Sequence, residues 1–332
     1  MRRSARIRAG RQLHLVANIV MSAVEGTGRS RASHLLSGGM NAAPHDRQIG
    51  FLCLSVTAAG WALNWPLVKL LLQEWPPLFA RGLAGVCASV ILGFIAFASR
   101  QSLKVPREAV PGLLFASFTN VFAWMGFGTI AMKFVTVGEG ALIIYTMPIW
   151  AMLLAWPIMR QRPTVRDVAA LVLGVAGVAL LLGADGYAFD RGRLIGIALC
   201  LSSAILFALG SVLNRKPLPM PPLAVVAWQV GLGCLAMLIL GVLFERPNYA
   251  AISPGGIASF VYMTLVPMGL CYLTWFETLR RLPPVSASTG LLLVPVFAVT
   301  AAAAILGEPL GLREVVAMAL TLGGVTLALR KV

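Results

Sequence analysis

Three residues in the first long apolar segment could together bind a small solute. Trp61, Asn64 and Trp65 are spaced so that on a helix they share one face. The Asn64 amide could hydrogen-bond a zwitterion while the two indole rings enclose its side chain. A polar side chain within a membrane is costly and suggests a transport pathway. The alternative interpretation is that the tryptophans anchor the helix at the membrane interface.

Two later segments carry comparable groups. Asn120, Trp124 and Gly128 form a stripe on the third apolar segment, and Tyr272 and Trp275 lie on the eighth. Aromatic stripes usually reflect ordinary packing. An unpaired amide in lipid is expensive, however, so Asn120 must face a polar group, which can be a structural partner or a ligand.

Two prolines occupy matching places in the fourth and ninth segments. Pro148 and Pro295 each remove one backbone hydrogen bond and free a carbonyl, so a break in each helix is expected. Tyr145 lies three residues before Pro148, and Thr289 lies six before Pro295. Breaks in corresponding helices point to a binding site, and we expect these four residues to contribute to it. The alternative is a pair of static kinks.

Residue types argue against catalysis. The three histidines fall within the first 48 residues, and the five cysteines show no metal or redox spacing. The sequence contains no catalytic triad pattern, zinc-protease motif or phosphate-binding glycine loop. We therefore expect neither an enzyme nor a bound metal or cofactor.

Composition predicts an all-α membrane protein. Of the residues, 58% are hydrophobic and 12% are charged, and the mean hydropathy is +0.84. The apolar windows are too long for barrel strands and suit helices of about 20 residues. We predict ten transmembrane helices, at about 49–72, 78–98, 109–131, 138–159, 166–183, 193–213, 222–243, 255–278, 285–305 and 312–329.

The chain also repeats itself. The block 136–178 aligns without a gap with 283–325, and this register places Pro148 on Pro295. We expect five helices in each half, with the first half at 49–185 and the second at 186–332. An odd number of spans inverts the second half relative to the first, which predicts two inverted repeats around a central cavity and transport by alternating access.

Loop charges predict the orientation. Bases are concentrated in one set of short loops, near positions 100–107, 160–166, 215–216 and 280–281, and at 330–331. By the positive-inside rule these loops are cytoplasmic, and so are both termini.

The first 48 residues form a basic extension with eight of the 27 bases and two of the 12 acids, so it accounts for +6 of the net charge of +15. This charge is no evidence for nucleic-acid binding. Three interpretations stay open: a disordered arm attracted to anionic lipid, a targeting segment, or translated sequence upstream of a start at Met40.

The remaining charged residues bear on energy coupling. Arg81 lies near the end of the second predicted span, where snorkelling accounts for an arginine without a function. Glu139 and Glu277 also lie near span ends, and no acid occupies a midplane position. The sequence therefore predicts uncoupled, facilitated transport. Proton exchange through Glu277 is the alternative.

Several motifs match a known pattern: Gly60-Trp61-Ala62-Leu63-Asn64 with Lys69, Ala131-Met132-Lys133, Pro148, Thr278-Leu279-Arg280, Pro295 and Gly307-Glu308-Pro309. With these motifs the chain resembles the drug/metabolite transporter superfamily with two EamA-type repeats. The resemblance covers about residues 49–330, and it implies a multi-pass protein of a bacterial inner membrane that binds small molecules and works without a cofactor. Within this superfamily the chain looks most like YddG-type exporters, which implies efflux of aromatic and other mostly neutral amino acids. A broad exporter of drugs or aromatic cations and a proton-coupled antiporter stay open, as does the oligomeric state, although a monomer suffices.

Overall fold

The protein is a bundle of helices. The computed structural model describes residues 44–160, 164–183, 191–214, 217–248 and 252–329, and within these ranges every regular element is helical. Most of the predicted N-terminal extension lies outside the described residues. Its last five residues do not, because the first described helix begins at Pro44 rather than near residue 49.

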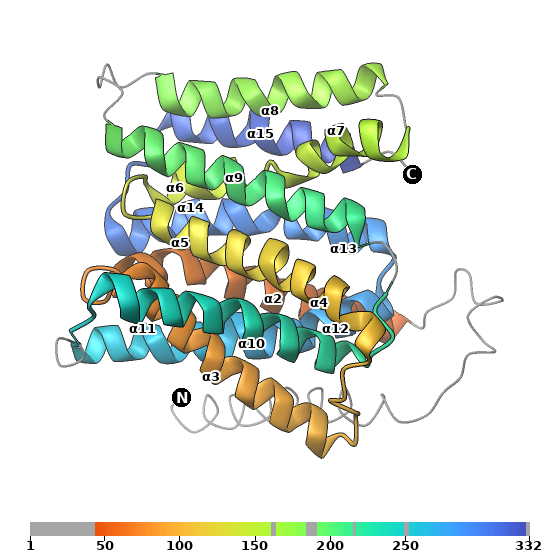
Figure 1. Cartoon of the computed structure of the whole chain (residues 1–332). Coiled ribbons are helices and arrows are strands. Elements are labelled where there is room, and N and C mark those ends of the chain that lie inside the picture. The colour runs from red at the N-terminus through yellow and green to blue at the C-terminus, as the bar shows by residue number, and fades with distance from the viewer. Residues whose placement is uncertain (1–43, 161–163, 184–190, 215–216, 249–251, 330–332) are drawn as a thin grey trace, which may run out of the picture.

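The two halves contain matching elements (Figure 1). π-Helical stretches interrupt the helices of both halves. The first half comprises α2 (Pro44–Leu71), α3 (Pro77–Ala98), the 3₁₀ turn η2 (Arg107–Ala109), α4 (Val110–Ala116), the π-helix η3 (Ser117–Phe127), α5 (Gly128–Ala131), α6 (Val137–Ile144), α7 (Met147–Met159) and α8 (Val165–Gly183). The second half comprises α9 (Arg191–Leu213), α10 (Pro222–Leu240), the π-helix η4 (Gly241–Glu245), α11 (Pro254–Leu265), the π-helix η5 (Val266–Leu270), α12 (Cys271–Arg281), α13 (Pro284–Leu291), α14 (Leu293–Leu306) and α15 (Leu312–Leu329).

Seven helices in the described part of the chain are long and apolar enough to cross a membrane. Two shorter apolar helices, Val168–Leu180 and Leu293–Leu306, lie within segments that were predicted to span. The seven spans are Asp46–Leu71, Pro77–Ala98, Arg107–Ala131, Val137–Ile158, Arg191–Leu213, Pro222–Glu245 and Pro254–Arg281.

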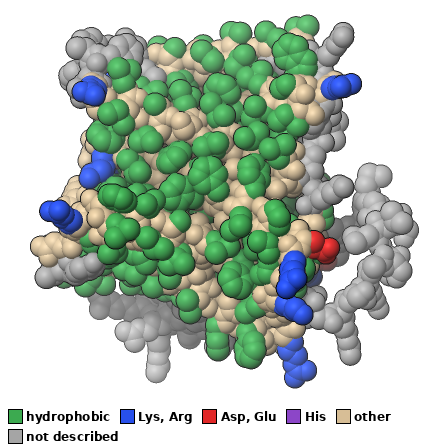
Figure 2. Space-filling model, viewed as in Figure 1, with side chains coloured by type: hydrophobic (Ala, Val, Ile, Leu, Met, Phe, Trp, Pro, Cys, Tyr) green, Lys and Arg blue, Asp and Glu red, His purple; other side chains and the backbone are tan. Residues whose placement is uncertain are grey.

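The outer surface suits a lipid environment. The face shown in Figure 2 is apolar across its middle, and its Lys and Arg side chains lie towards two opposite margins, where Figure 1 shows the helix ends. Phe94, Phe97 and Phe244 are about 70% exposed or more, which no soluble surface would favour. These rings are exposed on the protein surface because lipid chains would cover them in a membrane.

The two halves are interwoven. Helix α3 packs on its repeat counterpart α10, and α8 packs on its counterpart α15. Helix α2 of the first half packs on α12 and α14 of the second, whereas α9 of the second half packs on η3 and α7 of the first. Close contact depends on glycines, because a Cβ on Gly82 would lie 2.7 Å from the Cα of Leu238, and one on Gly60 would clash with Cys271 Sγ.

Acidic side chains hold helix N-termini at one end of the bundle. The Glu245 carboxylate accepts the N–H groups of Leu78 (3.1 Å) and Phe79 (2.9 Å) at the start of α3. Glu74 accepts the N–H and Oγ–H of Ser253, the residue that caps α11. Negative charge at a helix N-terminus is stabilising, so these contacts help to fix where α3 and α11 begin.

Candidate functional site: an aromatic cavity between the halves

A cavity of about 390 Å³ lies between the two halves. This size falls within the range of about 300–1,000 Å³ that is usual for small-molecule sites. Nine of the twelve residues that the sequence predicted for a site line it: Trp61, Asn64, Trp65, Asn120, Trp124, Gly128, Tyr145, Tyr272 and Trp275. The other lining residues are Val68, Arg81, Met125, Thr129, Met132, Ile144, Met147, Phe207, Pro267, Met268 and Leu291.

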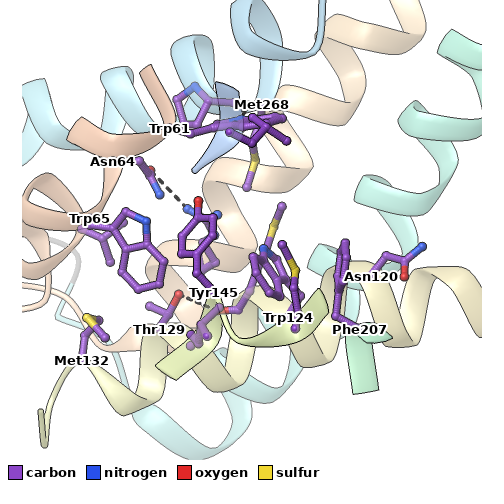
Figure 3. Close-up of a pocket in the computed structure, with 18 of the residues that line it drawn as sticks. Trp61, Asn64, Trp65, Asn120, Trp124, Thr129, Met132, Tyr145, Phe207 and Met268 are labelled. Atoms are coloured by element: carbon purple, nitrogen blue, oxygen red, sulfur yellow. Dashed lines mark hydrogen bonds between the residues drawn. The ribbon is translucent and has the colours of Figure 1, made fainter. Parts of the chain in front are cut away.

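Helix α2 presents one face of three residues to this cavity. Figure 3 shows Asn64 between Trp61 and Trp65, as the helical spacing predicted. The Trp61 Nε1–H donates to the carbonyl of Pro267 at 3.0 Å, which ties α2 to η5 of the other half. The Trp61 ring lies 6.1 Å from the ring of Tyr272 and 6.0 Å from that of Trp275. These rings form the first aromatic group of the wall.

A second aromatic group extends across the first half into α9. The Tyr145 ring lies 6.3 Å from both Trp65 and Trp124, and Trp124 lies 4.6 Å from Phe207. Phe207 was not predicted, because a single phenylalanine in an apolar helix carries no signal that separates a cavity wall from core. The two groups together give the cavity a largely aromatic surface.

Asn120 lies at the edge of this site. In Figure 3 it lies beyond Phe207 as seen from Trp124. Its Oδ1 accepts a hydrogen bond from Thr119 Oγ1 at 3.2 Å, so a neighbouring hydroxyl satisfies part of the amide. Gly128 lines the cavity where a Cβ would lie 3.2 Å from Ile144 Cδ1.

Both predicted helix breaks are present, yet the prolines do not line the cavity. Helix α6 ends at Ile144 and α7 begins at Met147, one residue before Pro148. Helix α13 ends at Leu291 and α14 begins at Leu293, two residues before the buried Pro295. Thr289 lies in α13, and its side chain is outside the described part of the structure. The prolines therefore shape the break that holds Tyr145 and the helix end at Leu291.

Each half also places a π-helix at the cavity. Asn120 and Trp124 belong to η3, and Pro267 and Met268 belong to η5. Such wider turns are rare and often occur at functional sites. The sequence predicted ordinary helix here, because the apolar pattern fits either form.

Arg81 corrects the sequence interpretation. It is only 6% exposed and lines the cavity, so it does not snorkel to a membrane surface. One terminal nitrogen donates to Asn64 Oδ1 at 3.4 Å, which is the dashed line at Asn64 in Figure 3. Among the described residues that line the cavity, Arg81 alone carries a charge.

A polar cluster lies beside the cavity at the start of α6. Lys69 Nζ lies 3.1 Å from Glu308 Oε1 and donates to the carbonyl of Val135 at 2.9 Å. Glu308 also accepts the N–H of Val137 at 2.9 Å. Lys69 directly follows the lining residue Val68, and Val135 lies three residues after the lining residue Met132. This cluster therefore adjoins one end of the cavity.

Comparison with known proteins identifies the family. The model of the EamA-like transporter family matches residues 48–183 and again 194–330. The chain belongs to the EamA-like transporter family. This is a family of membrane transporters, in agreement with the sequence evidence against an enzyme. Within the described residues, no group of three or more His, Cys, Asp or Glu side chains could hold a metal ion.

Several relatives are similar along most of their length. The chain is 27% identical over 274 residues to a "Probable amino-acid metabolite efflux pump" of Salmonella typhimurium, covering 80% of this chain and 89% of that protein. It is 26% identical over 246 residues to the "Uncharacterized transporter YoaV" of Bacillus subtilis, covering 74% and 84%. One solved crystal structure matches with a TM-score of 0.59 at 21% identity, covering 86% of this chain and 97% of that one. That match supports the fold.

Proposed function

We propose that this EamA-family transporter exports aromatic and other mostly neutral amino acids across a bacterial inner membrane, as YddG-type exporters do. The observation that carries the proposal is the aromatic cavity between the halves, where Arg81 and Asn64 provide a polar point among tryptophan and tyrosine rings. Relatives in Salmonella typhimurium and Escherichia coli that are described as probable amino-acid metabolite efflux pumps support the substrate class.

The proposed mechanism is alternating access by two inverted halves of five spans each, ten in all, divided at 49–185 and 186–332. The repeat supports it, because α6 and α13 begin and end at equivalent positions in the two halves. The packing supports it as well, since α2 on α14 has its counterpart in α9 on α7. Rocking of one half against the other would expose the cavity to each side in turn. Both termini then lie in the cytoplasm.

We propose that export is uncoupled and follows the substrate gradient. No acid is among the described residues that line the cavity. Glu277, the candidate for proton exchange, is 2% exposed and is paired with Arg280 at 2.7 Å and with Arg281. Its carboxylate is thus already engaged by two guanidinium groups, and Glu277 is not among the residues that line the cavity.

A second candidate is export of aromatic cations or drugs, which the ring-lined wall also favours through cation–π contacts.

Counterflow in liposomes tests the main proposal. Vesicles that contain the purified protein and excess unlabelled phenylalanine should accumulate labelled phenylalanine transiently, whereas protein-free vesicles should not. Accumulation of a labelled aromatic cation but not of phenylalanine would favour the second candidate. Alkalinisation or acidification of the lumen during counterflow would contradict uncoupled export.

A further inference from the structure

The Arg81 guanidinium is a buried cation whose donors are not satisfied. Its Nε has no hydrogen-bond partner among the described residues, and its contact with Asn64 is long at 3.4 Å. No carboxylate lies among the described lining residues. A charge buried in a membrane protein normally pairs with an opposite charge, so Arg81 lacks a partner that the cavity can supply from a bound solute.

We infer that Arg81 and Asn64 form a carboxylate-binding subsite, so the solute of this cavity is an apolar or aromatic carboxylate and not an aromatic cation. A guanidinium can donate two parallel N–H bonds to one carboxylate, and the Asn64 amide can add a further donor from α2. This inference rests on the proposed function and assigns the end of the solute that the proposal leaves open.

The geometry gives the solute an orientation. The polar pair is flanked by Trp61 and Trp65 on α2, and each tryptophan belongs to one aromatic group of the wall. A carboxylate at Arg81 therefore leaves the apolar part of the solute against either ring group. An amino group would meet no carboxylate among the described lining residues, so nothing there offsets a lone positive charge beside Arg81.

The number of cationic side chains in the cavity wall also limits the charge of the anion that it can bind. The repeat places Trp228 at the position that corresponds to Arg81, and Trp228 is 39% exposed and absent from the cavity wall. With a single cation, the site matches one carboxylate better than a doubly charged phosphate, which usually requires several bases.

The test compares three compounds that differ only at this end: phenylalanine, 3-phenylpropionate, which lacks the amino group, and 2-phenylethylamine, which lacks the carboxylate. Binding is followed by the fluorescence of the cavity tryptophans in detergent, and competition is followed by counterflow of labelled phenylalanine. We expect 3-phenylpropionate to bind within about tenfold of phenylalanine, and 2-phenylethylamine to bind about 10- to 100-fold more weakly. Equal or tighter binding of 2-phenylethylamine would overturn the inference.

Variants locate the effect. Arg81→Gln should weaken phenylalanine binding by about 10- to 100-fold and remove the preference for carboxylates. Arg81→Lys should keep part of the preference, because it retains the charge without the planar fork. Arg100→Gln, at an exposed arginine just beyond the other end of α3, is the matched control and should bind normally. Unchanged carboxylate preference in a folded Arg81→Gln protein would refute the assignment.

The outcomes separate the two proposals. Counterflow of phenylalanine without carboxylate preference would leave the exporter function standing and remove the Arg81 subsite. Carboxylate-dependent binding without counterflow of any of the three compounds would keep the subsite and remove the exporter function. If Arg81→Gln does not fold, the three compounds measured on the wild-type protein still decide the inference.

Discussion

Oε1 of Glu308, in the second half, lies 3.1 Å from Nζ of Lys69, in the first half. The same carboxylate accepts a hydrogen bond from the N–H of Val137 at the start of α6. One acidic side chain thus joins three segments, α2, α6 and the connection between α14 and α15. The first copy of the repeat has Gln161 at the equivalent position, so this charged junction is specified on one side only.

The contributions of Glu308 and Lys69 to stability should depend on each other. Glu308→Gln keeps an oxygen for Val137 but loses the charge, and we expect the free energy of unfolding to fall by about 1–3 kcal/mol. Thermal unfolding in detergent of Glu308→Gln, Lys69→Met and the double variant measures the coupling. Glu314→Gln is the control, because the Glu314 carboxylate accepts a hydrogen bond from the Gly311 N–H. Its effect on the free energy of unfolding should be additive with that of Lys69→Met. Full additivity of the Glu308 and Lys69 changes would contradict the junction.

Gly82 should not tolerate a side chain. A Cβ there would lie 2.7 Å from the Cα of Leu238, so Gly82→Ala must push α3 away from α10 and should cost about 1–3 kcal/mol. Gly93→Ala on the same helix is the control, since a Cβ at Gly93 meets no atom within 4 Å. That change should be neutral or stabilising by up to about 1 kcal/mol. Similar unfolding temperatures for the two variants would show that α3 and α10 are not in this close contact.

Acid should weaken the contact between Glu74 and Ser253. The Oγ–H and N–H of Ser253 donate to Glu74 and lower the pKa of that carboxyl below its ordinary value of 4.5. The contact therefore stabilises the fold fully above that value, and the stabilisation is lost as pH falls through the lowered folded-state pKa.

The corresponding measurement is the difference in unfolding temperature between the wild-type protein and Glu74→Gln. This difference should be constant near neutral pH and shrink below about pH 4.5. If the difference in unfolding temperature grew on acidification, the pKa of Glu74 could not be lowered in the folded protein.

The helix breaks should matter for transport more than for stability. Pro148→Ala and Pro295→Ala supply an N–H to the carbonyl that each proline frees, which favours a continuous helix. We expect slower counterflow with an unchanged or higher unfolding temperature. Pro157→Ala, at an exposed proline within α7, is the control and should transport normally. Normal counterflow in the double variant Pro148→Ala/Pro295→Ala would identify the breaks as static kinks.

Much of the cavity could be predicted because its signals are local. The spacing of Trp61, Asn64 and Trp65 fixes a shared helix face, and the missing N–H of Pro148 and Pro295 fixes where helices break. The repeat then indicates which segments correspond. These features depend on backbone geometry that a single segment already determines.

Other parts depend on packing that no segment determines alone. Arg81 lies only five residues into α3, and counting residues from the end of a span placed it at the membrane surface. Its burial arises because α3 packs on α10 and faces the cavity, which is a tertiary result. Phe207 and Met268 likewise resemble core residues until α9 and η5 are placed.

If the two halves alternate, one cavity must be reached from both sides of the membrane. A cysteine would replace Met125, which lines the cavity, in a Cys87→Ser background, because the other four native cysteines are buried. This variant would be exposed to a small membrane-impermeant thiol reagent on either side of oriented vesicles. Two inverted halves that alternate predict labelling from both sides and slower labelling in the presence of phenylalanine. Labelling from one side only, at a rate that phenylalanine does not change, would contradict a solute pathway through this cavity.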